Sequence, residues 1–484
     1  MVQSPPLSET GVRYYVDSAS GDDSASGLTS HAAWRTLEQI NSVVFEPGDS
    51  ILFRRGTTYQ GVLKPQGSGT ADSPIVIGAY GTGARPAIAG GGARSAVLLH
   101  NVEGWEIREL DISNPGPRDT TPRAGIYVLL ENYGIGRHYV VHDVVVHDVV
   151  GCDSLKPEVE NSGGIVFKAA GSQVATAFDG IQISHNTVSD VDNIGIGTLS
   201  QWNRHELYSA GTNHFVPITN VRIFRNDLSG LGGDGILVQN GLDPVTELNR
   251  VDGFGLRTTE ARAAILASNS VRPVVQCNEI TGGSATPPSF ALSVDAGNRD
   301  LVYQYNYSHD NNGPFMLFCA IAGSHTDGAT IRFNISQNDK DLVLGDFEIP
   351  VVANGCANAI KNVKFYHNVI YSPSAGTIVG SRGDHTPIAF TNNIFYGRPE
   401  GSAINDAVGT YDHNLYFNVA VPPHHANPVI ADPKFADPET LPGFRLDGDS
   451  PARGAGLAIH DGGDRDIHGT PIPRDAPPNI GATT

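Results

Sequence analysis

The sequence predicts an all-β fold, a single-stranded, right-handed parallel β-helix in which the chain winds through successive coils of short strands. Three observations lead to this prediction. A short motif built around one asparagine recurs along the chain, an apolar strand follows each copy after a turn that carries Gly or Asp, and only one segment has the pattern of an amphipathic helix. Short strands at a repeat of roughly 20 to 30 residues, punctuated by Gly and Asn, are typical of a solenoid of parallel strands.

The repeated motif reads apolar, any, any, Asn, any, apolar. Its asparagines are Asn186, Asn226, Asn278, Asn306, Asn334, Asn368, Asn393 and Asn414, and a weaker copy has Asp148 in the same place. The intervals between these asparagines are 40, 52, 28, 28, 34, 25 and 21 residues. We expect them to stack at one corner, where each amide bonds the backbone of the neighbouring coil. A β-propeller would need blades of about 40 residues, and a leucine-rich repeat would need a leucine pattern that is absent.

The two ends of the chain predict different caps. Residues 30–42 have the periodicity of an amphipathic helix, which is expected to cover the open N-terminal end of a solenoid. Residues 421–484 are rich in Pro and Asp and are expected to pack back over the last coils as an irregular C-terminal tail. The predicted parts are an N-terminal cap with the first strands (1–60), a β-helix (61–420) with cleft-forming insertions near 199–217 and 240–270, and the tail (421–484).

Composition limits the partners. The 32 Lys and Arg against 51 Asp and Glu give a net charge of −19, which argues against nucleic acid or an anionic membrane as the main partner. No apolar run approaches the roughly 18 residues of a membrane-spanning helix. The first ten residues have no signal-peptide pattern, so we expect a secreted or periplasmic protein whose signal peptide has been removed, or a cytoplasmic one. The oligomeric state is not predicted.

The four cysteines are Cys152, Cys277, Cys319 and Cys356. They are scattered, with neither a CxxC pair nor the spacing of a zinc site. We therefore expect buried or unpaired thiols.

Three stretches carry a resemblance to a known family. YYVDSASGDDSASGLTSHAAWRTLEQIN, PGDSILFRRGTTYQGVL and FRLDGDSPARGAG resemble the secreted bacterial β-helix carbohydrate enzymes. That superfamily includes glycoside hydrolases and polysaccharide lyases such as chondroitinase B and the alginate and pectate lyases. The resemblance extends over nearly the whole chain and implies a β-helix that acts on a carbohydrate, but it specifies the reaction poorly.

Function is expected in a groove on an outer face, because inward side chains fill a β-helix. Alternation along the strands places Lys168, Gln239 and Asp295 outward. In DLVLGDFEI, packing Phe347 inside would place Asp346 and Glu348 outside. Asp234 lies in a turn that could approach the same groove.

Two carboxylates across a sugar are the usual machinery of glycoside hydrolysis. We predict Asp295 as a catalytic residue together with Asp346 or Asp234. Each of these aspartates also fits a turn, and Asp295 could cap the turn at Gly297.

Several residues are candidates for substrate contact. Trp202 and His205 lie in the predicted insertion, where the indole could stack on a sugar or only anchor the loop. His309 could carry a proton or contact the sugar, whereas Asp310 in HDNNG is expected to form a turn. Arg299, Lys168, Gln239 and Glu348 complete the predicted substrate-binding set.

We expect the hydrolase to require no cofactor. The sequence leaves two alternative functions open. A polysaccharide lyase would use Lys168 as base, with Arg299, Arg382 or a Ca²⁺ ion to neutralise the uronate carboxylate. However, the predicted groove beyond Lys168 is not basic. The remaining alternative is a non-catalytic solenoid that binds glycans.

Overall fold

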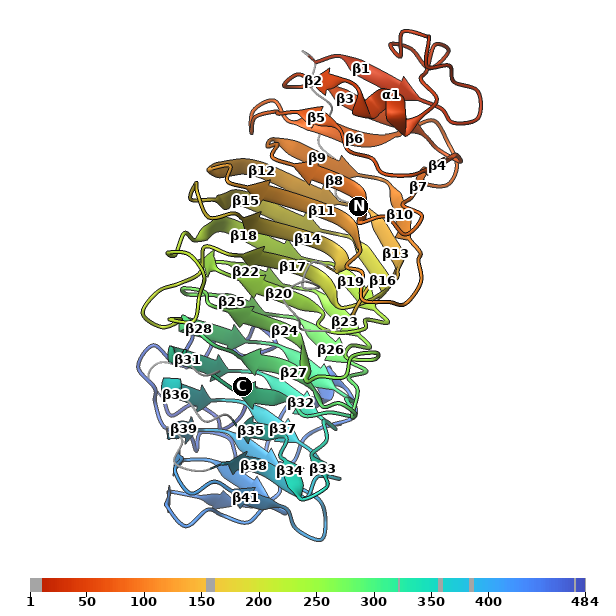
Figure 1. The fold of residues 1–484 in the computed structure, drawn as a ribbon. Helices are drawn as coiled ribbons and strands as arrows, with labels where there is room; N and C mark the ends of the chain where they lie inside the picture. The colour runs from red at the N-terminus through yellow and green to blue at the C-terminus, as the bar shows by residue number, and fades with distance from the viewer. Residues whose placement is uncertain are drawn as a thin grey trace. The chain divides into compact units, whose positions relative to one another are not determined.

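The computed structural model describes residues 11–153, 162–320, 323–355, 360–382, 387–473 and 476–483. The chain forms two compact units. Unit 1 contains the chain up to Arg204 together with Gly211–Leu242, and unit 2 contains His205–Ala210 and the chain from Asp243 onward. Both units are built from parallel strands, and each has three sheets that we call A, B and C (Figure 1).

Unit 1 repeats a strand of each sheet in turn. Sheet A contains β1 (Arg13–Val16), β3 (Ser50–Arg54), β6 (Ile75–Tyr80), β9 (Trp105–Arg108), β12 (Ile135–His142), β15 (Ala177–Ser184) and β18 (Ile218–Phe224), with β21 (Gly241–Leu242) beside β18. Sheet B contains β4 (Thr58–Gln60), β7 (Ala87–Ala89), β10 (Asp111–Asn114), β13 (Val145–Val149), β16 (Thr187–Val191) and β19 (Asp227–Ser229). Sheet C contains β8 (Ser95–His100), β11 (Ala124–Glu131), β14 (Gly163–Ala170), β17 (Ile194–Ser200) and β20 (Ile236–Gln239). The short strands β2 (Val44–Phe45) and β5 (Gln66–Gly67) pair separately.

Unit 2 continues the same order of strands. Sheet A contains β22 (Val245–Glu247), β25 (Val274–Gln276), β28 (Arg299–Gln304), β31 (Thr326–Arg332), β36 (Ile360–Tyr366), β39 (Ile388–Thr391), β42 (Thr410–Asp412) and β44 (His425–Ala426). Sheet B contains β23 (Arg250–Asp252), β26 (Glu279–Thr281), β29 (Tyr307–His309), β32 (Ile335–Gln337), β37 (Val369–Tyr371), β40 (Ile394–Tyr396), β43 (Leu415–Phe417) and β45 (Val429–Ile430). Sheet C contains β24 (Arg262–Ser268), β27 (Ser289–Val294), β30 (Met316–Phe318), β35 (Val352–Asn354), β38 (Thr377–Ser381) and β41 (Ala403–Asn405). A separate hairpin joins β33 (Leu342–Leu344) to β34 (Phe347–Ile349), and a 3₁₀ helix, η1 (Leu441–Phe444), follows the last strand.

Each unit is therefore a parallel β-helix, as the sequence predicts. The predicted right-handed winding agrees with the general hand of crossovers between parallel strands. Alternate side chains point inward and stack on the equivalent residue of the next coil. In unit 1, Ile165 pairs with Ile196, which pairs with Ile236, and all three are fully buried.

The predicted asparagine ladder is confirmed at the corner between sheets A and B. In unit 2, the Nδ2 of Asn306 donates to the Oδ1 of Asn334 at 2.9 Å, and the backbone N–H of Asn306 donates to the same oxygen at 2.9 Å. The Nδ2 also reaches back to the carbonyl of Val275 at 3.0 Å. The same bonds connect Asn278, Asn306, Asn334, Asn368, Asn393 and Asn414 in order. These asparagines are at most 2% exposed, so the ladder satisfies polar groups that the core would otherwise leave unpaired.

The residue before each ladder asparagine has a left-handed backbone. The φ angles are 55° at Cys277, 59° at Tyr305, 53° at Phe333 and 54° at His367. Non-glycine residues seldom adopt this conformation. The corner recurs with this conformation in successive coils, and three of the side chains that precede the asparagines stack on one another, Tyr305 on Phe333 and Phe333 on His367.

Sequence reasoning missed one ladder residue, Asn249. Its Nδ2 and its backbone N–H both donate to the Oδ1 of Asn278 at 3.0 Å. Asn249 divides the interval of 52 residues into 249 − 226 = 23 and 278 − 249 = 29. Asn249 does not fit the predicted motif, because Thr246 stands where the motif has an apolar residue. The segment near 240–270, expected to be a cleft-forming insertion, therefore contains β22, β23 and β24 and forms a coil.

The predicted N-terminal capping helix over 30–42 is wrong. Only α1 (Leu37–Asn41) is helical, and it begins after Thr36, whose side chain accepts from the N–H of Gln39. The residues before it are extended because they pair with β1: Trp34 N–H donates to Tyr15, and Asp17 N–H donates to Trp34. The apolar spacing of Ala33, Leu37 and Ile40 arises from burial of all three, not from one helical face.

The C-terminal segment runs back along unit 2 (Figure 1). Phe444, Leu446, Ala452, Ile480 and Ala482 form one buried cluster with the residues that follow four ladder asparagines, namely Ile335, Val369, Ile394 and Leu415. The tail thus covers the outer face of sheet B in these coils.

Cysteine chemistry differs from the expectation at one position. Cys319 is disulfide-bonded, so it is not a thiol. Cys152 and Cys277 are free, and Cys356 lies outside the described residues. Within the described part of the chain, no helix has both the length and the apolar character needed to cross a bilayer.

Replacing one ladder asparagine should destabilise the protein strongly. In Asn334→Ala, the N–H and Nδ2 of Asn306 lose their shared acceptor inside the core, which we expect to lower the free energy of unfolding by about 2–4 kcal/mol. Urea unfolding measures this change. The control is Asn312→Ala, which removes an exposed acceptor of Lys340 and should change stability by less than about 0.5 kcal/mol. Equal effects of the two substitutions would contradict the structural role of the ladder.

A buried carboxyl should make stability depend on pH. Asp339 is fully buried, and burial raises its pKa to about 6, although Ser308, Ser336 and Asn311 donate to it. Because the folded pKa lies above the unfolded value of 3.8, its contribution to stability is complete below pH 3.8 and is lost as the pH rises through about 6.

We therefore expect Asp339→Asn to gain stability relative to the unsubstituted protein as the pH rises from about 4 to about 8. The gain should approach about 3 kcal/mol, the free energy that corresponds to moving a pKa from 3.8 to about 6. Urea unfolding at several pH values gives the difference, with the exposed Asp432→Asn as control. Parallel pH curves for Asp339→Asn and the unsubstituted protein would rule out this origin.

Candidate functional site

A cavity of about 640 Å³ lies over the outer face of sheet C in unit 2. Its floor is formed by outward residues of neighbouring strands, because Leu317 of β30 pairs with Ala353 of β35, which pairs with Gly380 of β38. A Cβ on Gly380 would lie 3.0 Å from Cγ of Pro350, so glycine keeps this part of the floor low. We call it the hairpin cavity; Phe290, Leu317, Leu344, Asp346, Phe347, Glu348, Ile349, Pro350, Ala353, Asn354, Gly355, Thr377, Gly380, Ser381, Arg382 and Asn405 line it.

One wall is the hairpin of β33 and β34. The register of DLVLGDFEI that would pack Phe347 inside is wrong, because Phe347 is 59% exposed. Gly345, with φ 62°, and Asp346 form the turn between two antiparallel strands. Two apolar runs separated by Gly-Asp are a hairpin signal that the sequence contained. Asp346 and Glu348 are nevertheless exposed and line the cavity, as the outward assignment expected.

Polar side chains hold the hairpin against the sheet. The carboxylate of Glu348 accepts from the Oγ1 of Thr377 and lies 3.5 Å from the Nδ2 of Asn405. At the base of the hairpin, Asp341 accepts from the backbone N–H groups of Gly376 and Thr377 at 2.8 and 3.0 Å. Glu348 is therefore a carboxylate in a fixed position at the edge of an apolar cavity. Sequence reasoning missed Asp341, Thr377 and Asn405, because their roles depend on contacts between coils.

One cation lies in the same cavity. The guanidinium of Arg382 stacks over the ring of Phe347 at 4.6 Å from the ring centre. The hairpin cavity therefore combines two carboxylates, one guanidinium, the amides of Asn354 and Asn405, and an apolar floor. A mostly apolar cavity of this size with a few convergent polar groups is the usual form of a small-ligand site.

The other predicted catalytic residues do not line this cavity. Asp295 follows β27 and is half-buried, and its Oδ1 accepts from the N–H of Ala296 at 2.7 Å, whereas the N–H of Gly297, the turn it was expected to cap, donates to the carbonyl of His325. Asp234 belongs to unit 1 and is 5% exposed. Its backbone carbonyl accepts from Gly195 N–H at 2.9 Å.

Lys168 and Gln239 lie on the outer face of sheet C in unit 1. Lys168 of β14 pairs with Leu199 of β17. Thr198 of β17 pairs with Val238 of β20, so Leu199 and Gln239, the next residues, continue the same row. Alternation predicted this row correctly. Lys168 is only 8% exposed, and Gln239 uses its Oε1 to accept from the N–H of Ser200 at 2.8 Å. Lys168 is therefore largely buried, and Gln239 is engaged with the backbone of the neighbouring strand.

The side chain of Trp202 is buried and holds its loop against the β-helix. Its side chain is 3% exposed, its Nε1–H donates to the carbonyl of Ala170 at 3.3 Å, and its ring packs edge-on against His214. The prediction that the indole stacks on a sugar is wrong in this structure because no face of the ring is open.

The remaining predicted contacts are dispersed in unit 2. His205 contacts the Oδ1 of buried Asn269 through Nε2 at 2.7 Å, and burial lowers its pKa. Arg299 forms an ion pair with Glu206. Neither His205 nor Arg299 lines the hairpin cavity.

His309 lies on sheet B, stacked on Tyr307 at 4.5 Å, and its Nδ1 is 2.9 Å from Asp310. His309 therefore lies on a different sheet from Asp295, which follows β27 of sheet C, and it does not line the hairpin cavity. Asp310 has a φ of 53°, which confirms the predicted turn.

The part of the chain that the structure describes contains no cluster of three or more His, Cys, Asp or Glu side chains arranged to hold a metal ion.

No protein-family model matches the chain. A lacto-N-biosidase of Bifidobacterium longum subsp. longum is 28% identical over 521 aligned residues, which cover 87% of this chain and 32% of the relative. The chain thus spans about a third of the length of the curated relative that it matches.

Two solved structures share the fold. A GH136 lacto-N-biosidase from Eubacterium ramulus superposes with a TM-score of 0.64 and 21% identity, covering 87% of this chain and 68% of that chain. XylC in complex with xylose superposes with a TM-score of 0.54 and 12% identity, covering 97% and 98% of the two chains. The parallel β-helix is therefore shared with proteins that act on or bind sugars, and the resemblance to β-helical carbohydrate-active proteins is confirmed.

The structural role of Trp202 can be tested by removing its N–H. We expect Trp202→Phe to lower the free energy of unfolding by about 1–3 kcal/mol, because the carbonyl of Ala170 loses a buried donor. The substitution should leave the KM for any oligosaccharide that the protein cleaves unchanged. The matched control is Trp105→Phe, which removes an equally buried indole donor to Gly67. Urea unfolding and steady-state kinetics measure both effects. A rise in KM confined to Trp202→Phe, with unchanged stability, would restore the sugar-stacking role.

Proposed function

We propose that this chain is a glycoside hydrolase that acts on an oligosaccharide. The observation that carries the proposal is the 28% identity to a lacto-N-biosidase over 87% of the chain. The shared fold and a cavity with two carboxylates are consistent with it. By the same relation, the first substrates to examine are lacto-N-biosides.

The hairpin cavity is our proposed place for the chemistry. Glycoside hydrolysis uses one carboxyl group to protonate the leaving oxygen and another to activate water or attack the sugar. Glu348 has the fixed position that such a group requires, because Thr377 and Asn405 hold it, and Asp346 is the second carboxylate of the cavity. The apolar floor of Leu317 and Ala353 would face the C–H side of a sugar. Asp295 of unit 2 and Asp234 of unit 1 each remain an alternative catalytic candidate from the sequence.

A polysaccharide lyase is the second candidate, favoured by one observation: Arg382 lines the same cavity and could neutralise a uronate carboxylate. A lyase of this kind would gain activity from Ca²⁺, whereas the hydrolase needs no cofactor. The hydrolase is favoured because the guanidinium already stacks on Phe347 and the other charged side chains of the cavity are acidic.

We also propose that the protein works outside the reducing cytoplasm, as a secreted or periplasmic enzyme. The disulfide at Cys319 supports this location, because disulfides persist in oxidising compartments.

Activity and site can be tested together. We expect release of nitrophenol from a nitrophenyl lacto-N-bioside, and new reducing ends from the matching oligosaccharide, without the absorbance of an unsaturated uronate. Glu348→Gln and Asp346→Asn should each lower kcat at least about 100-fold with the fold intact, because loss of one acid/base group typically costs that much. The matched control is Glu400→Gln, an exposed glutamate outside the cavity.

Three outcomes would contradict parts of this proposal. Unsaturated product that requires Ca²⁺ would establish the lyase. Unchanged kcat in both cavity variants, with loss in Asp295→Asn or in Asp234→Asn, would move the chemistry to the residue whose substitution lowers kcat. No turnover of any glycan tested would leave only a glycan-binding protein.

A further inference from the structure

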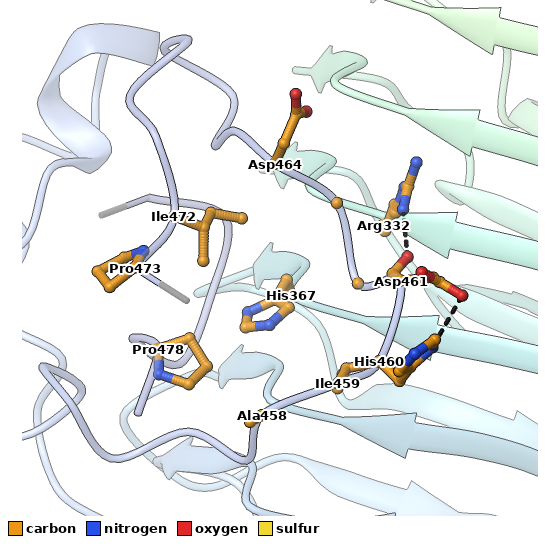
Figure 2. A pocket seen from close by; sticks show the side chains of 12 residues that line it. Arg332, His367, Ala458, Ile459, His460, Asp461, Asp464, Ile472, Pro473 and Pro478 are labelled. Carbon is orange, nitrogen blue, oxygen red and sulfur yellow. Dashed lines mark hydrogen bonds and ion pairs between the residues drawn. The ribbon is translucent and has the colours of Figure 1, made fainter. Parts of the chain in front are cut away.

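A second cavity, of about 780 Å³, lies in unit 2 between the β-helix and the C-terminal segment. We call it the tail cavity; Arg332, His367, Ala458, Ile459, His460, Asp461, Gly462, Gly463, Asp464, Ile472, Pro473 and Pro478 line it (Figure 2). Ile472, Pro473 and Pro478 lie on one side, the segment that carries Asp461 and Asp464 lies on the other, and His367 lies between them (Figure 2). Arg332 and His367 come from sheet A and its corner, so this cavity shares no lining residue with the hairpin cavity.

The walls of the tail cavity are fastened to the β-helix. Asn392 binds Leu457 twice, through Nδ2 to its carbonyl and Oδ1 to its N–H, both at 2.8 Å. Gly481 N–H donates to the carbonyl of Asn392 at 2.8 Å, and the Nδ1 of His367 lies 3.3 Å from the carbonyl of Gly481. The tail is thus pinned before and after the cavity, which keeps the space from collapsing.

The two walls are also joined to each other. Ile472 N–H donates to the carbonyl of Asp464 at 3.0 Å, next to a bridge between Arg465 and Pro471. Gly463, with φ 107°, lies so close to the β-helix that an added Cβ would be 2.9 Å from Phe333. A glycine at this point lets the wall approach the sheet while leaving the cavity beside it open.

Arg332 presents a hydrogen-bond donor in a fixed orientation. Its Nε donates to Gln304 at 2.8 Å, and its Nη1 donates to Tyr366 at 3.3 Å and to the carbonyl of Asp461 at 3.1 Å. Among the described residues, none accepts from Nη2. The guanidinium is therefore oriented by its other nitrogens and keeps one N–H₂ group for a ligand.

Asp464 supplies acceptors in the same cavity. Its side chain is 69% exposed, and its one ion-pair contact within the described chain is Arg465 at 3.9 Å. His460 pairs with Asp461 at the rim at 2.8 Å. Because one cation and two carboxylates share the cavity, an anionic ligand would meet repulsion, whereas a neutral polyol could both donate and accept.

We infer that the tail cavity is a second saccharide site, which binds a neutral mono- or disaccharide away from the hairpin cavity. Ring hydroxyls accept from Nη2 of Arg332 and donate to Asp464, and the C–H face of the sugar lies toward Ile472 and Pro473. The volume of about 780 Å³ falls within the range of small-ligand sites. The site would hold the enzyme on a glycan without taking part in bond cleavage.

Ligand-observed NMR with methyl glycosides of galactose, N-acetylglucosamine and xylose, and with glucuronate as the acidic probe, tests this inference on the full chain. We expect at least one neutral glycoside to bind, and Asp464→Asn and Arg332→Lys to weaken that binding about tenfold or more. Asp464 is exposed, so its variant should fold even if Arg332→Lys loosens the tail. The matched control is Asp432→Asn, an exposed aspartate outside the cavity, and Glu348→Gln separates this site from the hairpin cavity.

The inference fails if binding is unchanged in Asp464→Asn, if it is lost only in Glu348→Gln, if glucuronate alone binds, or if no neutral glycoside binds. Hydrolysis of oligosaccharides is a separate measurement, so a failure here leaves the proposed reaction untouched.

Discussion

The bonds between stacked asparagines are the interaction on which the rest of the structure depends. A coil must turn from sheet A to sheet B inside a buried corner, where backbone N–H and C=O groups have no water. Asn306 solves this by donating to Asn334 on one side and to Val275 on the other. Since each amide bonds the coils on both sides, one residue type at one position sets the register of the sheets. The strands can then be as short as three residues, as β29 is.

This regularity confines function to places where the chain departs from it. Inward positions are filled by stacked apolar side chains, so the coils alone offer only shallow outer faces. In unit 2, two departures create cavities: the hairpin of β33 and β34 over sheet C, and the C-terminal segment beside Arg332 and His367. The first brings two carboxylates to an apolar floor, and the second combines one guanidinium with carboxylates and prolines. The β-helix is thus a scaffold, and the additions to it form the cavities where we propose that sugars bind and react.

The features that sequence reasoning predicted are those that repeat. The ladder and the inward and outward alternation at Lys168 and Gln239 follow from periods that a single sequence displays. The ladder role of Asn249 was not predicted, because Thr246 occupies the position where the motif has an apolar residue. The helix expected over 30–42 failed because apolar spacing reports burial, and pairing of Trp34 with β1 buries the same residues in an extended chain.

The candidate site was only partly predictable for a different physical reason. Asp346 and Glu348 were identified as outward residues, yet by a register that placed Phe347 inside, whereas the Gly-Asp turn folds the segment into a hairpin. Trp202 was predicted to stack on a sugar because its loop is polar, but its indole N–H donates to the buried carbonyl of Ala170. Thr377 and Asn405 had no local signal, because their contacts with Glu348 span 29 and 57 residues of sequence.

The central claim is that a departure from the coils, the hairpin over sheet C, builds the site where sugar is cleaved. A crystal structure of the Glu348→Gln protein with a bound oligosaccharide tests it most directly. We predict a sugar ring over Leu317 and Ala353, with its glycosidic oxygen next to residue 348 or Asp346. A glycan whose scissile bond lies elsewhere, with the hairpin cavity empty, would contradict the claim.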